Sequence, residues 1–411
     1  MEGIRGWDPR GTDLFDHGRH VNPMGRYTTT ESATLISGPR NAMWLRDSAN
    51  QMQSYLPLLS ASSANDSLAS LYRGVINLQS RFLLKSPYCN SFQPPAESGI
   101  APANNGAATS DQVVPPYDNN FVFECKYELD SLAAFLEIST NYYTATKDVA
   151  FFGQYQWVNA VKAVMTVAEA MMTPTYAANG SVNTSPYTFQ RTTNRASETL
   201  ENNGLGNPTQ SGTSLIRSAF RPSDDATIYQ LFIPANMMFS RYLASTAEIV
   251  QKLGGQHHLA NQMNSLSVSL KAAISKYGIR DDPNHGRIYA YEVDGYGSMN
   301  IMDDANIPSL LSAPVYGYLD RTDNVYQNTR NVVLSADNPY FMRGPVINSV
   351  GGPHNGPGYA WPMASIARIQ TSDDDQEITS TLKELVSSTA GLGLIHESIN
   401  SFNQKDWTRQ W

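Results

Sequence analysis

Apolar residues spaced three and four positions apart recur along the chain, and this pattern constrains the fold more than any other feature. In one such stripe, residues 68–82, the apolar side chains fall on a single helix face. The others span residues 129–136, 157–168, 238–253, 259–274 and 378–385. A helix with one apolar face buries it against a neighbour. The sequence therefore predicts an all-α fold of paired helices.

Strand signals are few. Alternation over residues 287–293 runs into the Asp294-Gly295 turn and predicts a small β-hairpin. Residues 173–213 are rich in Thr, Asn, Ser and Gly and lack periodicity, which predicts a polar loop insertion. Helices joined by long loops suggest a toroid of helical hairpins. Because barrels often exceed 250 residues, we expect one domain over residues 1–411.

Charge and hydropathy exclude several partners. The sequence has 29 basic and 37 acidic residues, a net charge of −8 and no Lys/Arg run, so we expect no nucleic acid partner. It has no apolar run of about 18 residues, the length of a membrane span. Residues 1–16 lack the basic start and apolar run of a signal peptide. We expect a monomer.

Two features concern the compartment. Sequons at Asn65, Asn179 and Asn183 favour a secreted or secretory-pathway protein, with a cytoplasmic location as the alternative. The cysteines, Cys89 and Cys125, are consistent with two buried thiols or with one disulfide. The sequence leaves both questions open.

Four segments outside the apolar stripes carry carboxylates, and three of them also hold arginine, histidine or an aromatic residue. They are residues 41–48, 220–225, 302–306 and 393–398. Sugar sites need this mixture, because hydroxyls require donors and acceptors while the apolar face of the ring stacks on an aromatic side chain. We interpret the segments as parts of a carbohydrate site.

Residues 221–225 allow two interpretations. Pro222 and Ser223 suit an ordinary capped helix start. Alternatively, Arg221 beside Asp224 and Asp225 forms the setting in which proteins keep one carboxyl protonated as a proton donor. In the second case one aspartate is the acid and the other binds the sugar.

Glu397 is the candidate for a second catalytic carboxyl, against the alternative of a capping or salt-bridged glutamate. Glycoside hydrolysis commonly uses two carboxyls, and a separation of about 6.5–9.5 Å admits a water and gives inversion. His396 beside it is either a packed residue or a sugar ligand.

The remaining candidates are polar residues of the first and third segments. The first segment allows two interpretations. Either a sugar stacks on and is clamped by Trp44, Arg46 and Asp47, or Arg46 and Asp47 form a local ion pair. Calcium at Asp303 and Asp304 is the alternative to sugar binding there, but no EF-hand, HExxH or Cys/His spacing is present, so we expect no metal and no cofactor. We interpret residues 351–359 as a rigid rim turn.

Together with residues 326–330 and 406–409, these segments resemble glycoside hydrolase family 125 from about Asn41 onward. The resemblance implies an (α/α)6 barrel and a metal-independent exo-α-1,6-mannosidase that inverts the anomeric carbon. It implies Asp224 or Asp225 as the general acid and Glu397 as the general base. Our candidates for sugar binding are Trp44, Arg46, Asp47, Arg221, Asp303, Asp304, Asn306 and His396.

Two other functions compete with this prediction. The first is an inverting exo-glucosidase of the glucoamylase type on the same barrel. The second is a non-catalytic carbohydrate-binding protein, which predicts loss of Glu397 or of both Asp224 and Asp225. All three positions hold carboxylates, and this favours an enzyme.

Overall fold

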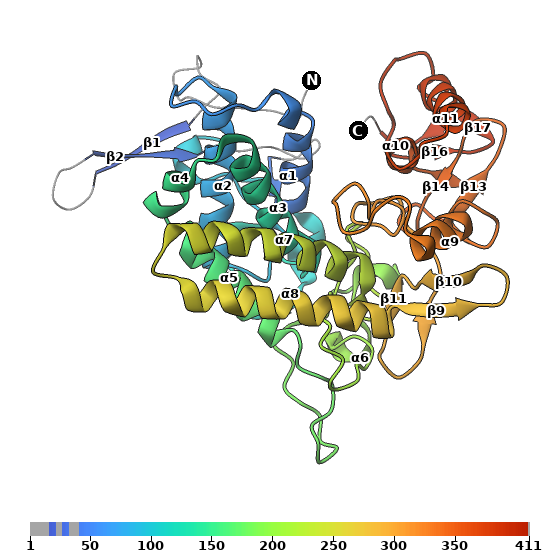
Figure 1. The fold of residues 1–411 in the computed structure, drawn as a ribbon, viewed down its shortest axis with the longest axis horizontal. Helices are drawn as coiled ribbons and strands as arrows, with labels where there is room; N and C mark the ends of the chain where they lie inside the picture. Colours follow the sequence, from blue (N-terminus) through green and yellow to red (C-terminus); the bar gives the residue numbers. More distant parts are fainter. Residues whose placement is uncertain (1–15, 22–26, 33–40, 410–411) are drawn as a thin grey trace. The chain divides into compact units, whose positions relative to one another are not determined.

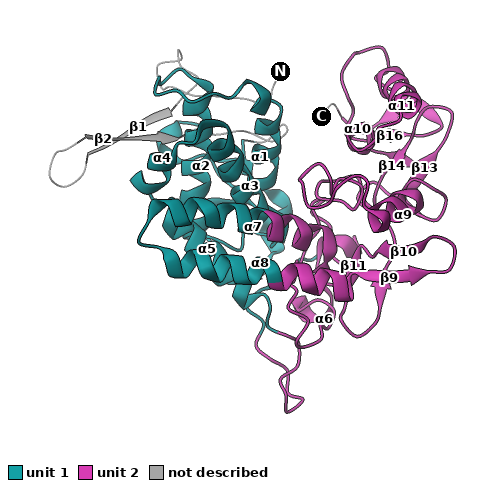
Figure 2. Ribbon diagram, in the orientation of Figure 1, with its two compact units in different colours: residues 1–173, 185–192, 242–268 teal, residues 174–184, 193–241, 269–411 magenta. Residues whose placement is uncertain are grey.

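The structure, a computed structural model, describes residues 16–21, 27–32 and 41–409. The chain divides into two compact units (Figure 2). Unit 1 comprises residues 1–173, 185–192 and 242–268, and unit 2 comprises residues 174–184, 193–241 and 269–411. The single domain expected over residues 1–411 stays a prediction. None of the described helices is long and apolar enough to cross a membrane.

Unit 1 is built on helices, labelled in Figure 1. They are α1 (Leu45–Gln53), α2 (Leu68–Lys85), α3 (Leu129–Thr146), α4 (Val149–Gln154) and α5 (Trp157–Ala170). Three of these match predicted apolar stripes, while α1 and α4 were not predicted. The N-cap Ser67 of α2 accepts a hydrogen bond from the Ser70 backbone N–H at 3.1 Å. Helix α1 packs on α3, and α2 packs on α3 and α5, so the core of this unit is helix against helix.

Two further helices, α7 (Ile233–Leu253) and α8 (His257–Tyr277), each have residues in both units. Their apolar stripes were predicted, as was the end of α8 before Gly278. The backbone N–H of Gly278 donates to the carbonyl of Ile274 at 2.8 Å, which closes the last turn. Gly254 follows α7 with φ +70°, a conformation that favours glycine.

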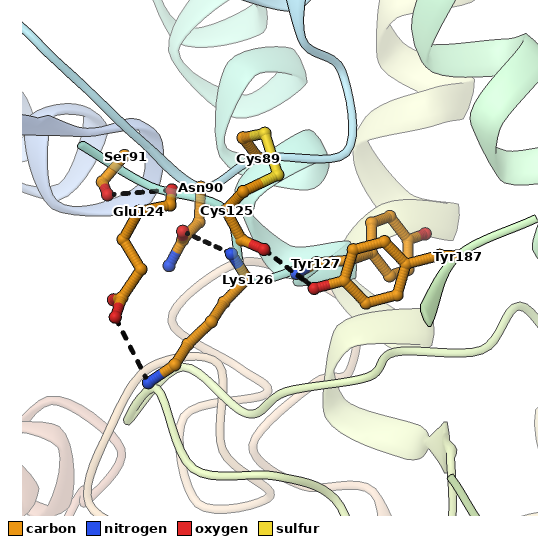
Figure 3. Close-up of a disulfide and its surroundings, with 8 residues drawn as sticks. All are labelled: Cys89, Asn90, Ser91, Glu124, Cys125, Lys126, Tyr127 and Tyr187. Atoms are coloured by element: carbon orange, nitrogen blue, oxygen red, sulfur yellow. Dashed lines mark hydrogen bonds and ion pairs between the residues drawn. A yellow bond between two sulfur atoms is a disulfide. The ribbon is translucent and has the colours of Figure 1, made fainter. Parts of the chain in front are cut away.

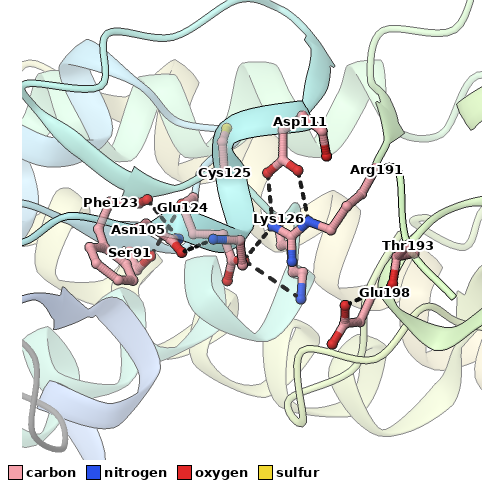
Figure 4. Close-up of polar contacts among 12 residues, drawn as sticks. Ser91, Asn105, Asp111, Phe123, Glu124, Cys125, Lys126, Arg191, Thr193 and Glu198 are labelled. Carbon is pink, nitrogen blue, oxygen red and sulfur yellow. Dashed lines mark hydrogen bonds and ion pairs between the residues drawn. The ribbon is translucent and has the colours of Figure 1, made fainter. Parts of the chain in front are cut away.

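Short antiparallel strands accompany the helices of unit 1. They are β1 (Asp16–Val21), β2 (Tyr27–Ser32), β3 (Met43–Trp44), β4 (Ser91–Phe92), β5 (Gln112–Val114), β6 (Val122–Glu124) and β7 (Thr188–Gln190). They form the sheets β1-β2, β3-β4-β6 and β5-β7. Arg191, directly after β7, pairs with both oxygens of Asp111 at 2.7 and 2.8 Å and with Glu124 at 2.6 Å (Figure 4). This buried network ties the end of β7 to the start of β5 and the end of β6.

Cys89 and Cys125 form a disulfide, with an S–S distance of 2.03 Å. The next residue, Asn90, accepts a hydrogen bond from the Lys126 backbone N–H at 3.1 Å (Figure 3). The carbonyl of Cys125 accepts one from the Tyr187 hydroxyl at 2.9 Å. The cross-link therefore joins the segment just before β4 to the segment just after β6.

Unit 2 contains shorter helices. They are α6 (Glu201–Gly204), α9 (Asn324–Val333), α10 (Pro362–Gln370) and α11 (Asp375–Ser387). Asp374 caps α11 by accepting from the Gln376 backbone N–H at 2.8 Å, as the acidic start of its stripe predicted. Asp323 caps α9 in the same way through Tyr326 at 2.8 Å. Helix α10 packs on α11 and on β14, and Leu385 of α11 is buried, whereas Leu382 of its predicted stripe is exposed.

The described strands of unit 2 make four small antiparallel sheets. They are β8 (Leu231–Phe232), β9 (Ile279–Asp282), β10 (Gly286–Tyr289), β11 (Glu292–Val293), β12 (Met299–Asn300), β13 (Phe341–Arg343), β14 (Asn348–Val350), β15 (Tyr359–Ala360), β16 (Ile399–Asn400) and β17 (Asn403–Trp407). The sheet orders are β12-β11-β8, β10-β9, β13-β14 and β15-β16-β17. The hairpin predicted at residues 287–293 is present as two, because β10 pairs with β9 and β11 pairs with β12 across the predicted turn.

The polar stretch predicted as a loop, residues 173–213, is mainly irregular in the structure. It holds β7, a 3₁₀ turn at Ala196–Glu198 and α6. Backbone hydrogen bonds within it, such as Asn183 N–H to the carbonyl of Thr175 at 2.9 Å, give it internal order.

We predict that Cys89→Ser/Cys125→Ser lowers the free energy of unfolding by about 3 kcal/mol, because a cross-link over 36 residues restricts the unfolded chain. Urea denaturation followed by circular dichroism measures this. The wild type in reductant serves as the control and is expected to match the variant. A variant as stable as the oxidised wild type contradicts the prediction.

Candidate active site

Residues 221–225 form a tight turn. Of the two interpretations, the capped helix start is not realised, since the next helix, α7, begins at Ile233. The Arg221 backbone N–H donates to the Asp225 carbonyl at 2.8 Å, and the Asp224 N–H donates to the Arg221 carbonyl at 2.9 Å. Closing this turn puts Asp224 in the left-handed region, at φ +65°. Strain of this kind in a residue other than glycine is concentrated at functional sites.

A buried ion pair fixes the Arg221 side chain. Its Nε donates to Oε1 of Glu292 at 2.6 Å, and both side chains are almost wholly buried. Burial opposes the charge of the guanidinium, but Glu292 outweighs it and raises the pKa of Arg221 further above its usual value. Sequence reasoning missed Glu292. Its signal was a charged residue within the apolar run from Ile288 to Val293.

The third segment places two buried aspartates with different partners. Both oxygens of Asp303 accept backbone N–H groups, from Leu310 at 2.8 Å and Leu311 at 2.9 Å. Burial raises the pKa of Asp303 to about 7. Both carboxylate oxygens are thus already used to hold the following loop, and sugar binding by Asp303 stays a prediction.

Asp304 is held on one side only. Its Oδ1 accepts from the backbone N–H of Asn306 at 3.0 Å and from the Asn306 side-chain amide at 2.9 Å. Its Oδ2 has no hydrogen-bond partner among the described residues. Burial raises the pKa of Asp304, and Asn306 and the charge of Arg221 oppose that rise. The arrangement leaves one buried acceptor for a ligand.

His354 lies beside the carboxylate of Asp225. Its Nδ1 lies 3.5 Å from Oδ1 of Asp225, and its ring meets Trp361 edge-on at 5.9 Å. Burial opposes protonation, but the contact with Asp225 and the charges of Asp224 and Glu397 raise the pKa of His354. Three carboxylates from two segments of the chain therefore act on one imidazole. The sequence suggested only a rim turn here, although a histidine among four glycines was a usable signal.

Glu397 is positioned by strand pairing. Its backbone N–H donates to the Arg409 carbonyl at 2.8 Å, which continues the pairing of β16 with β17. The Arg409 guanidinium donates to Oε1 of the buried Glu397 at 2.6 Å. Such a two-point attachment fixes both the backbone and the carboxylate.

His396 is packed against an aromatic ring. It stacks on Trp407 with the ring centroids 4.3 Å apart. Burial lowers the pKa of His396, which favours the neutral imidazole. Neither ring nitrogen has a hydrogen-bond partner in the part of the chain that the structure describes.

The candidates from the first segment lie in unit 1. Arg46 and Asp47 occupy the first turn of α1, where a cation is disfavoured by the helix dipole. Carboxylates offset this: Arg46 donates to Glu128 at 2.8 Å, Asp130 at 3.2 Å and Asp47 at 3.0 Å. The ion-pair alternative is therefore realised, together with two buried partners that the sequence did not reveal.

Trp44, just before α1, is half-buried and lies 5.3 Å from the Phe123 ring. Its indole Nε1 has no hydrogen-bond partner within residues 16–21, 27–32 and 41–409. Sugar binding by Trp44, Arg46 and Asp47 stays a prediction.

The charges of Asp224, Asp225 and Glu397 thus act on His354, and the charge of Asp304 acts on Arg221. No group of three or more His, Cys, Asp or Glu side chains in the described ranges is arranged to hold a metal ion. These segments offer carboxylates, aromatic ring faces and buried polar atoms without a partner among the described residues, namely Oδ2 of Asp304 and the ring nitrogens of His396. This chemistry suits proton transfer at a neutral, hydroxyl-rich ligand.

Comparison with known families identifies the fold and the reaction class. Residues 16–411 match the family model of the metal-independent α-mannosidases, GH125. The chain belongs to glycoside hydrolase family 125. This family 125 protein is a glycoside hydrolase that acts on α-mannosyl linkages, and the predicted resemblance is confirmed.

Individual relatives agree with this assignment. The chain is 47% identical to the Meiotically up-regulated gene 157 protein of Schizosaccharomyces pombe, over 92% of this chain and 73% of that protein. A solved metal-independent α-mannosidase of Streptococcus pneumoniae, in a non-productive substrate complex with α-1,6-mannobiose, is 32% identical. Its TM-score is 0.81, over 96% of this chain and 87% of that one.

A more distant structure shares the fold alone. A bacterial glucoamylase complexed with acarbose matches with a TM-score of 0.51 at 13% identity, over 88% of this chain and 45% of that one. The predicted fold class, an (α/α)6 barrel, is confirmed by these neighbours. At this identity the glucoamylase gives no support to the glucosidase alternative.

We predict that Gly352→Ala lowers kcat/KM on an α-mannoside by about tenfold. The new Cβ would lie 2.8 Å from Oδ2 and 2.9 Å from Cγ of Asp304, and Asn306 holds that carboxylate in place. A displaced acceptor costs roughly one hydrogen bond to a charged group. Gly106→Ala is the control, because its Cβ meets nothing within 4 Å. Equal kcat/KM for the two variants contradicts the prediction.

Proposed function

We propose that this family 125 enzyme removes terminal α-1,6-linked mannose from the non-reducing end of mannosides, N-glycans or mannan chains, with inversion. The observation that carries the linkage is the similarity, at 32% identity, to the pneumococcal α-mannosidase complexed with α-1,6-mannobiose. The substrate is a neutral oligosaccharide, which agrees with the absence of any Lys/Arg run in the sequence.

Glu397 acts as the general base in this proposal. It takes a proton from a water that attacks the anomeric carbon, while the bond from that carbon to the leaving oxygen breaks. The Arg409 ion pair holds the carboxylate in one position during proton transfer. Attack from the face opposite the leaving group gives the β-anomer of mannose.

Asp224 is our choice for the general acid, which protonates the leaving oxygen. The hydrogen-bonded turn holds the Asp224 backbone at φ +65°, a conformation that aspartate tolerates better than most residues, and this defined position beside His354 supports Asp224 as the acid. Asp225 has contacts from both oxygens, Oδ1 with His354 at 3.5 Å and Oδ2 with Ser223 at 3.3 Å. Asp225 therefore serves as a supporting carboxylate.

Sugar recognition rests on polar atoms that the protein buries without satisfying. Oδ2 of Asp304 and the ring nitrogens of His396 have no partner among the described residues. Burying such atoms costs free energy unless a ligand completes their hydrogen bonds. The Asn306 amide holds Asp304 within electrostatic range of Arg221 and Asp225 in the catalytic turn.

We also propose that the enzyme works as a monomer in an oxidising compartment, secreted or within the secretory pathway. The disulfide between Cys89 and Cys125 supports this location, since cytosolic glutathione keeps most thiols reduced. Retention of the disulfide in protein from its natural source tests the proposal.

We predict that incubation with α-1,6-mannobiose releases mannose whose first-formed anomer is β. Proton NMR during the first minutes distinguishes this from the α-anomer that a retaining enzyme releases. Isomaltose is the matched control for the glucosidase alternative and is expected to remain intact. Initial α-mannose contradicts inversion, and cleavage of isomaltose alone contradicts the substrate.

We predict that the general acid and the general base can be distinguished by how the turnover of each variant depends on the leaving group of the substrate. Asp224→Asn should reduce turnover strongly on mannobiose but retain much of it on mannosyl fluoride, whose leaving group needs no proton. Glu397→Gln should reduce both by roughly 10²- to 10⁴-fold, because each reaction needs an activated water.

Asp225→Asn is the matched comparison for the acid. Leaving-group dependence in Asp225→Asn but not in Asp224→Asn moves the acid to Asp225. Near-normal turnover of Glu397→Gln contradicts its role as the base.

A further inference from the structure

Glu292 has more hydrogen bonds than an ordinary ion-pair partner. It lies on β11, the central strand of the sheet β12-β11-β8, and is fully buried. Its oxygens accept from Arg221 Nε at 2.6 Å, Ile228 N–H at 3.1 Å, Tyr229 N–H at 3.2 Å and the Asn300 amide at 3.4 Å. A carboxylate that accepts four hydrogen bonds is held in one orientation, and it fixes the positions of the groups that donate to it.

Arg221 takes its orientation from this carboxylate. Its guanidinium carbon also lies 5.5 Å from the centroid of the Tyr291 ring. The planar guanidinium is therefore held at one edge by Glu292 and on one face by Tyr291. Its Nη2 is buried and has no hydrogen-bond partner in the described ranges. A bidentate pair of arginine and glutamate, the frequent arrangement, would use this nitrogen, whereas here it stays available to a further acceptor.

An unpartnered acceptor lies within electrostatic range of this donor. Oδ2 of Asp304 is buried and unpartnered among the described residues, and the charges of Arg221 and Asp304 act on each other. The pair has no hydrogen bond between its two side chains in the part of the chain that the structure describes. An unpartnered donor and an unpartnered acceptor are the two kinds of group whose hydrogen bonds a sugar hydroxyl can complete.

We propose that Glu292 is a positioning residue, which holds the Arg221 guanidinium so that Nη2 donates to a hydroxyl of the terminal mannose. The proposal rests on the proposed function and deepens it, because it adds a residue that acts on recognition without touching the substrate. In this proposal Glu292 only orients Arg221, and the Arg221 guanidinium makes the contact with the sugar.

A double-mutant cycle tests this relation. Glu292→Gln, which keeps the side-chain shape, should lower kcat/KM on α-1,6-mannobiose roughly tenfold to a hundredfold, the effect of losing a hydrogen bond from a charged group. Arg221→Met should have a similar effect. In the Arg221→Met background, adding Glu292→Gln should change kcat/KM by less than about threefold and raise the melting temperature, because no unpaired buried charge remains.

Hydrolysis rates on monodeoxy mannosides give a measurement that a change in protein stability alone does not alter. The wild type should lose rate on the analogue that lacks the hydroxyl bound by Arg221. Glu292→Gln should hydrolyse that analogue and the complete mannoside at similar rates. Equal selectivity in the two proteins contradicts the proposal.

Arg221→Lys covers the case in which Glu292→Gln does not fold. Lysine keeps a charge for Glu292 but has no second nitrogen to offer, so the protein should stay folded and lose kcat/KM to the same degree. Retained activity in Arg221→Lys contradicts the proposal.

Glu377→Gln is the matched control. Glu377 on α11 binds two arginines, Arg330 at 2.8 Å and Arg368 at 2.7 Å. This variant should lower the melting temperature and leave kcat/KM unchanged. Glu292→Gln behaving like Glu377→Gln, or fully additive losses in the cycle, overturns the role assigned to Glu292.

The wild type separates this proposal from the proposed function. If it hydrolyses another α-mannoside and leaves α-1,6-mannobiose intact, the linkage is wrong, and the same cycle is run on the mannoside that it hydrolyses.

Discussion

Pairing of buried charges is the constraint on which the site depends. Carboxylates and guanidinium groups leave water only when each has a partner, because an isolated buried charge is very costly. In unit 2 this requirement fixes Arg221 on Glu292 and Glu397 on Arg409. The imperfect pairing is equally informative, since Nη2 of Arg221 and Oδ2 of Asp304, which have no partner among the described residues, are the atoms that bind the sugar in our proposal.

The same principle operates in unit 1, with a different result. Arg46 is bound by Glu128 and Asp130, and both oxygens of Asp111 bind Arg191. These networks pair each arginine with more than one carboxylate oxygen and tie helices and short strands together. In unit 2, Arg221 pairs with a single carboxylate oxygen and keeps its buried Nη2 without a partner in the described ranges, as Arg330 does its Nε.

The helices were predictable because amphipathic periodicity is a local property. The stripes at residues 68–82 and 259–274 identified α2 and α8, including the glycine after α8. The turn at residues 221–225 was not predictable in this way. Pro222 and Ser223 are equally suited to a helix start, and only the hydrogen bonds between Arg221 and Asp225 select the turn.

The sequence by itself determined the helical character of the fold, the family and the segments that carry carboxylates, because these depend on residue type and spacing along the chain. Only the tertiary structure decided which side chains meet. Glu292 lies 71 positions from Arg221 along the chain, and His354 is farther still from Asp225, so neither contact could be inferred from spacing. Contacts between side chains far apart in the sequence depend on how the loops fold back, and no local sequence pattern predicts them.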